Sequence, residues 1–425
     1  MTSYRVFTGD DKGQLKSVAF DIPGSESTSH ISTTTIQIGA DNKSPLHRLQ
    51  CHRDSDSDTG ILATARADGL ITTYSYTTGS NELKELSSWS ETRMKNSDRF
   101  VGLHAFQRRK GWLTCTHNGR LRLSNTFGER SDSDPPADLF ASLPMRLNDL
   151  RLSPSFSSLA YGGDEVDLSV WDVERTFSDK PQSTDEVGKK RKKGKNELMY
   201  AEIWRAKQLP NDSLSLRQPV HITSLSFIHG SQLPNQQSSF HIVTGNKNGA
   251  LRRFDTRTAR RPVSNWENIA KIGGIRNIEP GRNEYELFVS DNGSSLSSID
   301  VRSGKICYSY KGLPSAATSF SPVAKSHLAS VSLDRVFRLH TVYPPPPQAN
   351  EQQLKKGEVI GQEFLKSTPT AIIWDKFETQ VATEDGDEED VWEAMEVRGE
   401  EDDGSIDEDE SEDEQPRKAR KRSRK

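Results

Sequence analysis

The chain has few of the residues on which secreted, membrane-spanning and metal-binding proteins depend. Its three cysteines, Cys51, Cys115 and Cys307, lie too far apart for a disulfide framework or a Cys-x-x-Cys metal site. No apolar run approaches the ~20 residues that span a bilayer, and no basic and apolar signal peptide opens the chain. These absences predict a reducing compartment, the cytosol or the nucleus.

Apolar residues are also scarce, at 32% of 425 residues, and the low fraction bears on the fold class. Globular chains usually contain ~45–50% when glycine is counted with the apolar residues. A thick core is therefore not expected, and many short, half-buried strands are favoured. The length allows two or three ordinary domains or one large all-β domain.

Catalytic and cofactor-binding motifs are missing too. Gly9-Asp10-Asp11-Lys12-Gly13 fails the spacing of a phosphate-binding loop, and there is no HExxH zinc motif and no GxSxG nucleophile elbow. The ten histidines do not cluster. The chain is therefore predicted to be a non-enzyme without a cofactor or metal. Catalytic groups that converge from distant loops remain the distant alternative.

The chain as a whole has little excess charge of either sign, with a net charge of -4. This value is the sum over two parts of opposite charge. Residues 384–425 contain 19 acidic and 8 basic side chains, a local net of -11, which leaves +7 for the remaining 383 residues. The body is mildly basic, and an acidic tail masks it.

A strand–turn–strand unit recurs along the body. Each unit has an apolar run, a short turn with Asp, Asn or Gly, and an alternating run. The seven turns are Asp11-Lys12-Gly13, Ala67-Asp68-Gly69, His117-Asn118-Gly119, Gly162-Gly163-Asp164-Glu165, Asn246-Lys247-Asn248-Gly249, Asp291-Asn292-Gly293 and Leu333-Asp334-Arg335. Asn-Gly and Asp-Gly supply the positive φ angles of tight hairpins, so the pattern predicts seven hairpins.

The spacing of these hairpins is that of WD40 blades. Gly249 and Gly293 are 44 residues apart, and Asp334 follows after about 41 more, against a period of ~40–45 residues for such blades. Val170-Trp171-Asp172-Val173 is the one literal Trp-Asp signature. The chain is therefore predicted to be all-β, with residues 1–376 forming one seven-bladed WD40-type β-propeller.

The two ends of the body predict how the ring closes. The chain enters the first hairpin directly at Tyr4, so blade 1 lacks its inner strand. Residues 367–375 look like an inner strand without a hairpin of its own. We expect them to pair into blade 1 and so remove an open sheet edge. A surface strand that caps the last blade is the alternative.

Two polar segments interrupt or follow the repeats. Residues 176–197 are predicted to be a basic insertion, after which Leu198 to Trp204 supply the outer strand of blade 4. Residues 377–425 are predicted to be disordered, acidic at first and then basic. Within that tail, Trp392 and Met395 lie three residues apart in an apolar island, which we interpret as a short docking motif.

Two basic runs are candidate nuclear localisation signals. Their residues are Lys189, Lys190, Arg191, Lys192, Lys193 and Lys195 in the insertion, and Arg420, Lys421 and Arg422 in the tail. A solvated linker and a contact with RNA phosphates are the alternatives for either run alone.

A resemblance to a known family rests on four stretches. They are Tyr161-Gly162-Gly163 with Trp171-Asp172, Glu202 to Lys207 with Asn211 to Val220, Phe254 to Arg257 with Arg260-Arg261-Pro262-Val263, and Asp300 to Lys305 with Tyr310-Lys311-Gly312 and Leu328 to Arg335. Together with the tail island, they are similar to the WD-repeat ribosome-assembly factors of the Nop-seven-associated protein one type and their animal counterparts. The likeness covers roughly residues 145–397.

This resemblance implies a function and a location. It implies a non-catalytic scaffold in biogenesis of the large (60S) ribosomal subunit, which binds early nucleolar precursor particles and supports ribosomal RNA processing. The implied partners are assembly factors, an AAA-type ATPase that releases the protein, and ribosomal RNA, with no membrane and no small-molecule substrate. A generic nuclear WD40 adaptor for chromatin or for a ubiquitin ligase is the alternative.

The candidate interface lies in the second and third stretches, which generic WD40 blades do not need. Its residues are Trp204, Arg205, Lys207, Arg257, Arg260 and Arg261. For Glu202, Trp204 and Pro219 a structural role in the outer strand is equally expected. For Arg252, Arg253 and the arginines that follow, a basic patch facing RNA and the covering of strand edges weigh the same.

Overall fold

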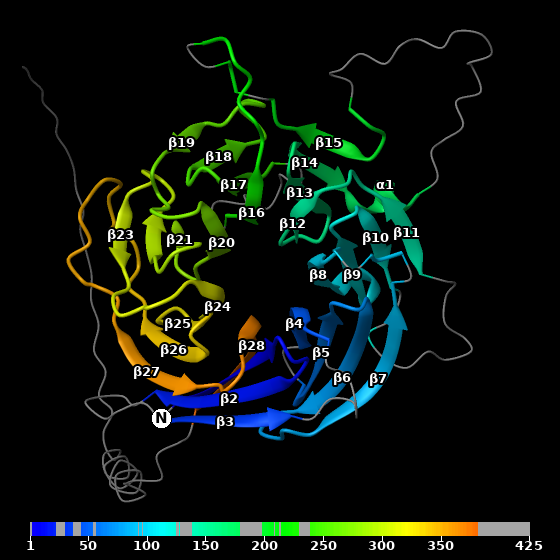
Figure 1. Ribbon diagram of the computed structural model, residues 1–425, viewed down its shortest axis with the longest axis vertical. Helices are drawn as coiled ribbons and strands as arrows, with labels where there is room; N and C mark the ends of the chain where they lie inside the picture. The colour runs from blue at the N-terminus through cyan, green and yellow to red at the C-terminus, as the bar shows by residue number, and fades with distance from the viewer. Residues whose placement is uncertain are drawn as a thin grey trace, which may run out of the picture. The chain divides into compact units, whose positions relative to one another are not determined.

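Seven four-stranded antiparallel sheets surround a common centre in the part of the chain that the structure describes (Figure 1). The structure is a computed structural model. It describes residues 2–380 apart from 23–29, 37–43, 54–56, 92, 96, 125–126, 128–137, 179–197, 208, 212–213 and 229–238. Both candidate localisation signals and the tail motif of Trp392 and Met395 lie outside the described residues. The all-β fold class and the seven-bladed propeller are confirmed.

Each blade runs from an inner strand at the centre to an outer strand at the periphery. Blade 1 consists of β28 (Pro369–Gln380), β1 (Thr2–Asp10), β2 (Leu15–Ile22) and β3 (His30–Ile36); blade 2 of β4 (Leu46–Arg53), β5 (Thr59–Arg66), β6 (Leu70–Thr77) and β7 (Leu83–Ser90); blade 3 of β8 (Phe100–Phe106), β9 (Gly111–Thr116), β10 (Arg120–Leu123) and β11 (Leu139–Ser142); blade 4 of β12 (Leu147–Leu152), β13 (Ser158–Gly163), β14 (Val166–Asp172) and β15 (Glu202–Arg205). Blade 5 consists of β16 (Ile222–Phe227), β17 (His241–Asn246), β18 (Leu251–Asp255) and β19 (Ser264–Trp266); blade 6 of β20 (Ile275–Pro280), β21 (Glu286–Asp291), β22 (Leu296–Asp300) and β23 (Ile306–Ser309); blade 7 of β24 (Ala317–Val323), β25 (His327–Ser332), β26 (Val336–Thr341) and β27 (Val359–Phe364). A 3₁₀ turn, η1 (Gln107–Arg109), and a short helix, α1 (Val173–Phe177), complete the described elements.

The hairpin turns form for the reason that their residues predict. In blade 2, Asp68 Oδ1 accepts a hydrogen bond from Leu70 N at 3.0 Å, and Gly69 takes a φ of 91°. In blade 5, Asn248 Oδ1 accepts one from Ala250 N at 3.2 Å, and Gly249 takes a φ of 85°. The Asx side chain fixes the turn, and glycine adopts the left-handed backbone without a Cβ penalty.

The core lies between the blades rather than within any one of them. Each of the seven boundaries holds its own cluster of buried apolar side chains, drawn from the two blades that meet there. At the boundary of blades 1 and 7, for example, Val6 and Trp374 pack with Val331 and Phe337. Since no blade buries its faces alone, stability depends on every blade having two neighbours.

Hydrogen bonds between neighbouring inner strands also join the blades at every boundary. In order around the ring, these bonds are Thr370 Oγ1 to Leu46 O, Arg48 Nη2 to Val101 O, His104 Nε2 to Leu150 O, Asn148 Nδ2 to Ile222 O, Ile278 N to Ser224 Oγ, Asn277 Nδ2 to Thr318 O and Ile372 N to Ser319 Oγ. They span 2.5 to 3.3 Å. Polar inner-strand residues therefore have a structural role around the whole ring.

Blade 1 is assembled from both ends of the described chain. β28 pairs antiparallel with β1, with Val6 opposite Trp374 and Thr8 opposite Ile372. Next to this pairing, Arg5 Nε donates to Asp375 Oδ2 at 2.8 Å, and both side chains are buried. The strand begins at Pro369 and continues to Gln380, five residues past 375.

The segment after the Trp-Asp signature departs from expectation. An insertion was expected to begin at Thr176, but helix α1 occupies Val173–Phe177. Asp172 of the signature caps this helix, because its side chain accepts a hydrogen bond from Arg175 N at 2.8 Å. Among the described residues, no helix is long and apolar enough to cross a membrane.

Candidate interaction surfaces

Trp204 lies in the core, so its ring is not available to a partner. The side chain is 8% exposed and belongs to the apolar cluster between blades 4 and 5. Its ring meets Phe254 of β18 edge-on, with centroids 5.8 Å apart. β15 presents Trp204 inward because its burial alternates along the strand. The structure therefore supports the structural role that the sequence left open for this residue.

Arg205, the next residue of β15, is only partly buried and forms an ion pair with Glu202. Arg205 Nε donates to Glu202 Oε1 at 2.6 Å, and a second nitrogen pairs with the other carboxylate oxygen. Glu202 is buried and also accepts from Ser169 Oγ at 2.5 Å and from Met199 N at 3.0 Å. The hydrogen bonds to Glu202 raise the pKa of Arg205. Arg205 therefore neutralises a buried carboxylate that holds β14, β15 and the segment before β15 together.

Arg260 joins the outer edges of blades 4 and 5. Its Nε donates to Arg205 O at 2.7 Å, and its own carbonyl accepts from Lys207 N at 2.7 Å. The loop 256–263, between β18 and β19, is thereby fastened to the segment that follows β15. Lys207 and Arg261 are exposed beside this joint, and Arg257 is exposed earlier in the same loop.

Exposed apolar side chains also occur on the connections of the same two blades. Val263 ends the blade 5 loop with half its side chain exposed, and Leu198, Met199 and Tyr200 are exposed before β15. Arginine, methionine and tyrosine are enriched in protein interfaces. We call Leu198–Tyr200, Lys207, Arg257, Arg261 and Val263 the outer-edge surface.

The arginines of β18 are tied to strand edges. Arg253 Nη1 donates to Val301 O of blade 6 at 3.0 Å, and Arg252 Nε donates to Asn265 Oδ1 of β19 at 3.3 Å. Burial lowers the pKa of Arg252. Of the two interpretations for this run, the covering of strand edges fits Arg252 and Arg253, whereas an exposed basic surface fits Arg257 and Arg261.

A second candidate site, which sequence reasoning missed, is the central channel. A cavity of about 360 Å³ runs between the inner strands. In each blade, the residue after a buried inner-strand aliphatic or aromatic side chain faces this cavity, and it is polar in six blades out of seven. These residues are Gln50, His104, Arg151, Ser226, Glu279, Ser321 and, as the apolar member, Ile373. Arg48 and Asp149 also line the cavity, each two residues earlier in its inner strand than Gln50 and Arg151.

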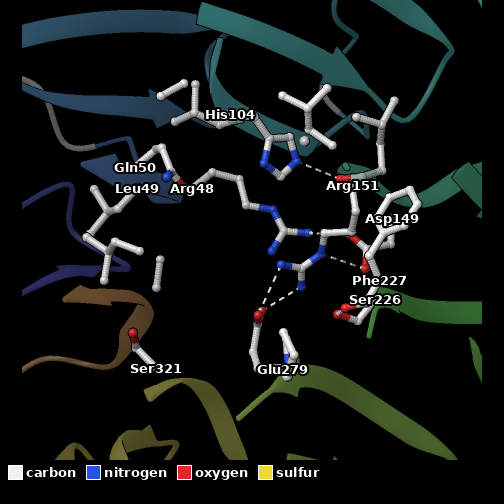
Figure 2. Close-up of a pocket in the computed structure, with 18 of the residues that line it drawn as sticks. Arg48, Leu49, Gln50, His104, Asp149, Arg151, Ser226, Phe227, Glu279 and Ser321 are labelled. Atoms are coloured by element: carbon white, nitrogen blue, oxygen red, sulfur yellow. Dashed lines mark hydrogen bonds and ion pairs between the residues drawn. The ribbon is translucent and has the colours of Figure 1, made fainter. Parts of the chain in front are cut away.

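Ion pairs cross the channel between blades that are not neighbours (Figure 2). Arg151 of blade 4 donates to both carboxylate oxygens of Glu279 of blade 6, at 2.6 and 3.2 Å. Its Nε also lies 3.3 Å from Asp149 Oδ2. Burial lowers the pKa of Arg151, but the attraction of Asp149 and Glu279 outweighs it, and the pKa is raised.

His104 adds no charge to the channel at neutral pH. Burial, followed by repulsion from Arg151, lowers the pKa of His104 to about 4. The neutral ring donates through Nε2 to Leu150 O at 2.8 Å. With two arginines and two carboxylates, these channel residues are close to electrically neutral.

Metal-ion and cysteine chemistry find little support in the described residues. In that part of the chain, no group of three or more His, Cys, Asp or Glu side chains is arranged to hold a metal ion. Cys51 and Cys115 are buried, and burial raises the pKa of both thiols.

Curated relatives of the chain are WD-repeat and ribosome biogenesis proteins. The chain is 27% identical to human "WD repeat-containing protein 74" over 246 residues, which cover 57% of this chain and 55% of that protein. It is 25% identical to the fission yeast "Ribosome biogenesis protein nsa1" over 226 residues, 51% of each chain. It is 32% identical to "Ribosome biogenesis protein NSA1" of Meyerozyma guilliermondii over 152 residues, 34% of this chain and 33% of that protein. The chain thus spans about half the length of the first two relatives.

Solved structures show the same architecture. The WD40 propeller domain of Doa1 superposes with a TM-score of 0.50 at 10% identity, over 77% of this chain and 86% of that one. Raptor from Chaetomium thermophilum gives 0.52 at 13% identity, over 77% of this chain and 25% of that one. At such identities the likeness concerns the fold alone. No protein-family profile matches the chain.

Proposed function

We propose, from the confirmed similarity of this chain to WD-repeat ribosome biogenesis proteins of the NSA1 type, that it is a non-catalytic scaffold in assembly of the large ribosomal subunit. In this role it binds early precursor particles in the nucleolus, supports ribosomal RNA processing and is released by an AAA-type ATPase. The observation that carries the proposal is the coincidence of the family-specific stretches with the outer-edge surface. Lys207, Arg257 and Arg261 are exposed there, and exposed apolar residues occur on connections of the same two blades.

Contacts beneath the outer-edge surface hold the edges of blades 4 and 5 together. Arg260 and Glu202 bind the two outer edges through buried or half-buried contacts, so the exposed cations are held in fixed relative positions. A preorganised surface loses less conformational entropy when a partner binds. Lys207, Arg257 and Arg261 supply the charge that attracts acidic protein segments and RNA, whereas Arg205, Arg260 and Trp204 keep the surface in shape.

Import into the nucleus belongs to the same proposal. The basic runs 189–195 and 420–422 lie outside the described residues and are proposed as nuclear localisation signals on their sequence alone. Replacement of the six cations of the first run and the three of the second by Gln should leave a fluorescent fusion in the cytoplasm. Nucleolar signal in that double variant would remove this part of the proposal.

Affinity purification of the tagged full chain tests the function directly. Large-subunit precursor RNA and assembly factors are the expected co-purified species, and blocking the ATPase should increase their amount. The alternative, a generic WD40 adaptor, predicts a ubiquitin ligase or nucleosomes without precursor RNA. That second outcome would overturn the proposal.

A further inference from the structure

We propose that the central channel binds an acidic side chain of a partner protein, an Asp or Glu flanked by apolar residues, through the guanidinium of Arg48. This site is separate from the outer-edge surface and does not depend on the proposed function. The four charged residues that argue for it come from blades 2, 4 and 6, so the ring must be closed before the site exists.

The two carboxylates of the channel are already occupied. Asp149 Oδ2 accepts from Leu225 N at 2.9 Å, from Ser224 Oγ at 3.1 Å and from Arg151 Nε at 3.3 Å. Glu279 receives two hydrogen bonds from Arg151. Both acids therefore serve to neutralise Arg151 and to join blades 4, 5 and 6.

Arg48 is left with much less compensation. Its Nη2 donates to Val101 O at 3.3 Å and lies 4.0 Å from Asp149 Oδ1. A guanidinium has five N–H donors, and the Arg48 side chain is 38% exposed within the channel. Figure 2 shows this guanidinium in the middle of the cavity, beside that of Arg151. Burial, and to a lesser extent the positive charge of Arg151, lowers the pKa of Arg48 although Asp149 opposes both effects. A carboxylate that paired with Arg48 would offset these costs.

One end of the channel favours apolar residues next to that carboxylate in the partner. At this end the inner strands finish, and apolar side chains line the cavity. They are Leu152, Pro154, Phe156, Phe227, Pro280 and Pro322. Pro154 is exposed at this end. An acidic side chain that enters from this end passes these residues, so apolar flanking residues in the partner would be buried against them.

The charge balance argues for a protein segment rather than RNA. The charged residues of the channel, two arginines and two carboxylates, sum to about zero, whereas binding of RNA relies on a surplus of cations. A single carboxylate needs only one guanidinium with N–H donors to spare, as Arg48 has. The cavity of about 360 Å³ suits a few side chains.

The test uses the full chain and a display library of random heptapeptides. We expect enrichment of peptides with one Asp or Glu next to Leu, Ile, Phe or Pro. An enriched peptide and its twin with Gln in place of the acid should differ in Kd by about tenfold or more, the usual effect of a charge-assisted hydrogen bond. Equal binding of the twins, or enrichment without acidic residues, would overturn the proposal.

Two channel variants should shift this binding in opposite directions. Arg48→Gln should weaken the acidic peptide about tenfold, and Arg48→Lys should restore part of the affinity. Glu279→Gln should strengthen it, because Arg151 then becomes available to the same carboxylate. Arg99→Gln is the matched control, since Arg99 is exposed outside the channel and donates to Asn148.

Melting curves of each variant separate loss of binding from loss of folding. If Arg48→Gln melts like the unmodified chain and still binds, the site is not in the channel. If Arg48→Gln unfolds, the proposal is tested by Glu279→Gln instead. Stronger binding of the acidic peptide by that variant supports the channel site, and unchanged or weaker binding contradicts it. Displacement of the peptide by a single-stranded oligoribonucleotide, and not by free glutamate peptides, would show that RNA occupies the channel instead.

Discussion

The central channel and the outer edge of blades 4 and 5 both carry arginines, but they hold them in different ways. In the channel, Arg151 and Arg48 belong to inner strands. Arg151 is bonded across the ring to Glu279, and Arg48 donates to Val101 O of the neighbouring blade. At the outer edge, Arg257 and Arg261 belong to a loop and are exposed. The same residue type is thus largely held by contacts within the ring where strands converge, with Arg48 as the proposed exception, and it is exposed at Arg257 and Arg261 where a loop turns. Position in the ring, rather than residue type, separates the two roles.

The largest effect is expected where the inner ring is interrupted. Deletion of Ser367–Asp375 removes most of β28, including Trp374 and the carboxylate that pairs with Arg5. Loss of a buried Trp alone costs about 3–5 kcal/mol, a large part of a typical stability of ~5–15 kcal/mol. We expect no cooperative unfolding transition in this variant, measured by circular dichroism against temperature.

A truncation after Gln380 is its control. It removes residues 381–425 and leaves every described inner strand in place. Its melting temperature should match that of the full chain. Closure by β28 would be unnecessary if the deletion variant melted as the control does.

At the outer edge of blades 4 and 5, substitution of a core residue should destabilise the fold far more than substitution of a surface residue. Trp204→Ala opens a cavity against Phe254 and should cost about 3–5 kcal/mol in the free energy of unfolding. Lys207→Ala, three residues further on, should change it by less than ~0.5 kcal/mol, since its side chain is exposed. Urea titrations of both variants measure the difference. Equal costs would show that Lys207 is as structural as Trp204.

A smaller effect should come from Glu286, a buried carboxylate that forms no ion pair with any of the residues that the structure describes. Glu286 is 2% exposed, and its Oε2 accepts from Asn283 Nδ2 at 3.1 Å, while Oε1 has no hydrogen-bond partner among the described residues. Burial raises its pKa from 4.5 to about 7. The folded state therefore holds a proton that the unfolded state releases, and this contribution to stability is present below pH 4.5 and lost as the pH rises to about 7.

Glu286→Gln isolates that titration. The variant keeps an acceptor for Asn283 but cannot ionise, so its stability should decline less than that of the unmodified chain between pH 5 and pH 8. The upper bound of the difference is about 3 kcal/mol, set by the size of the pKa shift. Parallel melting profiles over this range would mean that Glu286 is ionised without cost.

The hairpins and the count of blades were predictable because they depend on local chemistry. Asp68 and Asn248 form their turns with residues two positions away, so the signal lies within each segment. The outer strand Ser264–Trp266 was missed because three residues are too few to show a periodic pattern, and only pairing with β18 defines it. Helix α1 was missed because Asp172 is both the last residue of β14 and the N-cap of the helix, so the sequence shows no break between the two elements.

The candidate site was only partly predictable, for the same physical reason. Family-specific residues could be located, but sequence could not tell that Trp204 turns inward while Lys207 stays outside. The channel escaped notice because Arg151 and Glu279 are 128 residues apart and meet only across a closed ring. A polar residue after the buried aliphatic or aromatic side chain in six of the seven inner strands was the available signal, and it resembled ordinary strand alternation.

Co-purification of large-subunit precursor RNA with a charge-reversed outer edge tests the central claim most directly. The variant carries Lys207→Glu, Arg257→Glu and Arg261→Glu, and the control carries the same charge change at exposed lysines of other blades or connections, Lys12→Glu, Lys95→Glu and Lys311→Glu. We predict that the variant melts like the unmodified chain and loses most of the precursor RNA, while the control retains it. Equal recovery from variant and control would contradict a role of the outer-edge surface in large-subunit assembly.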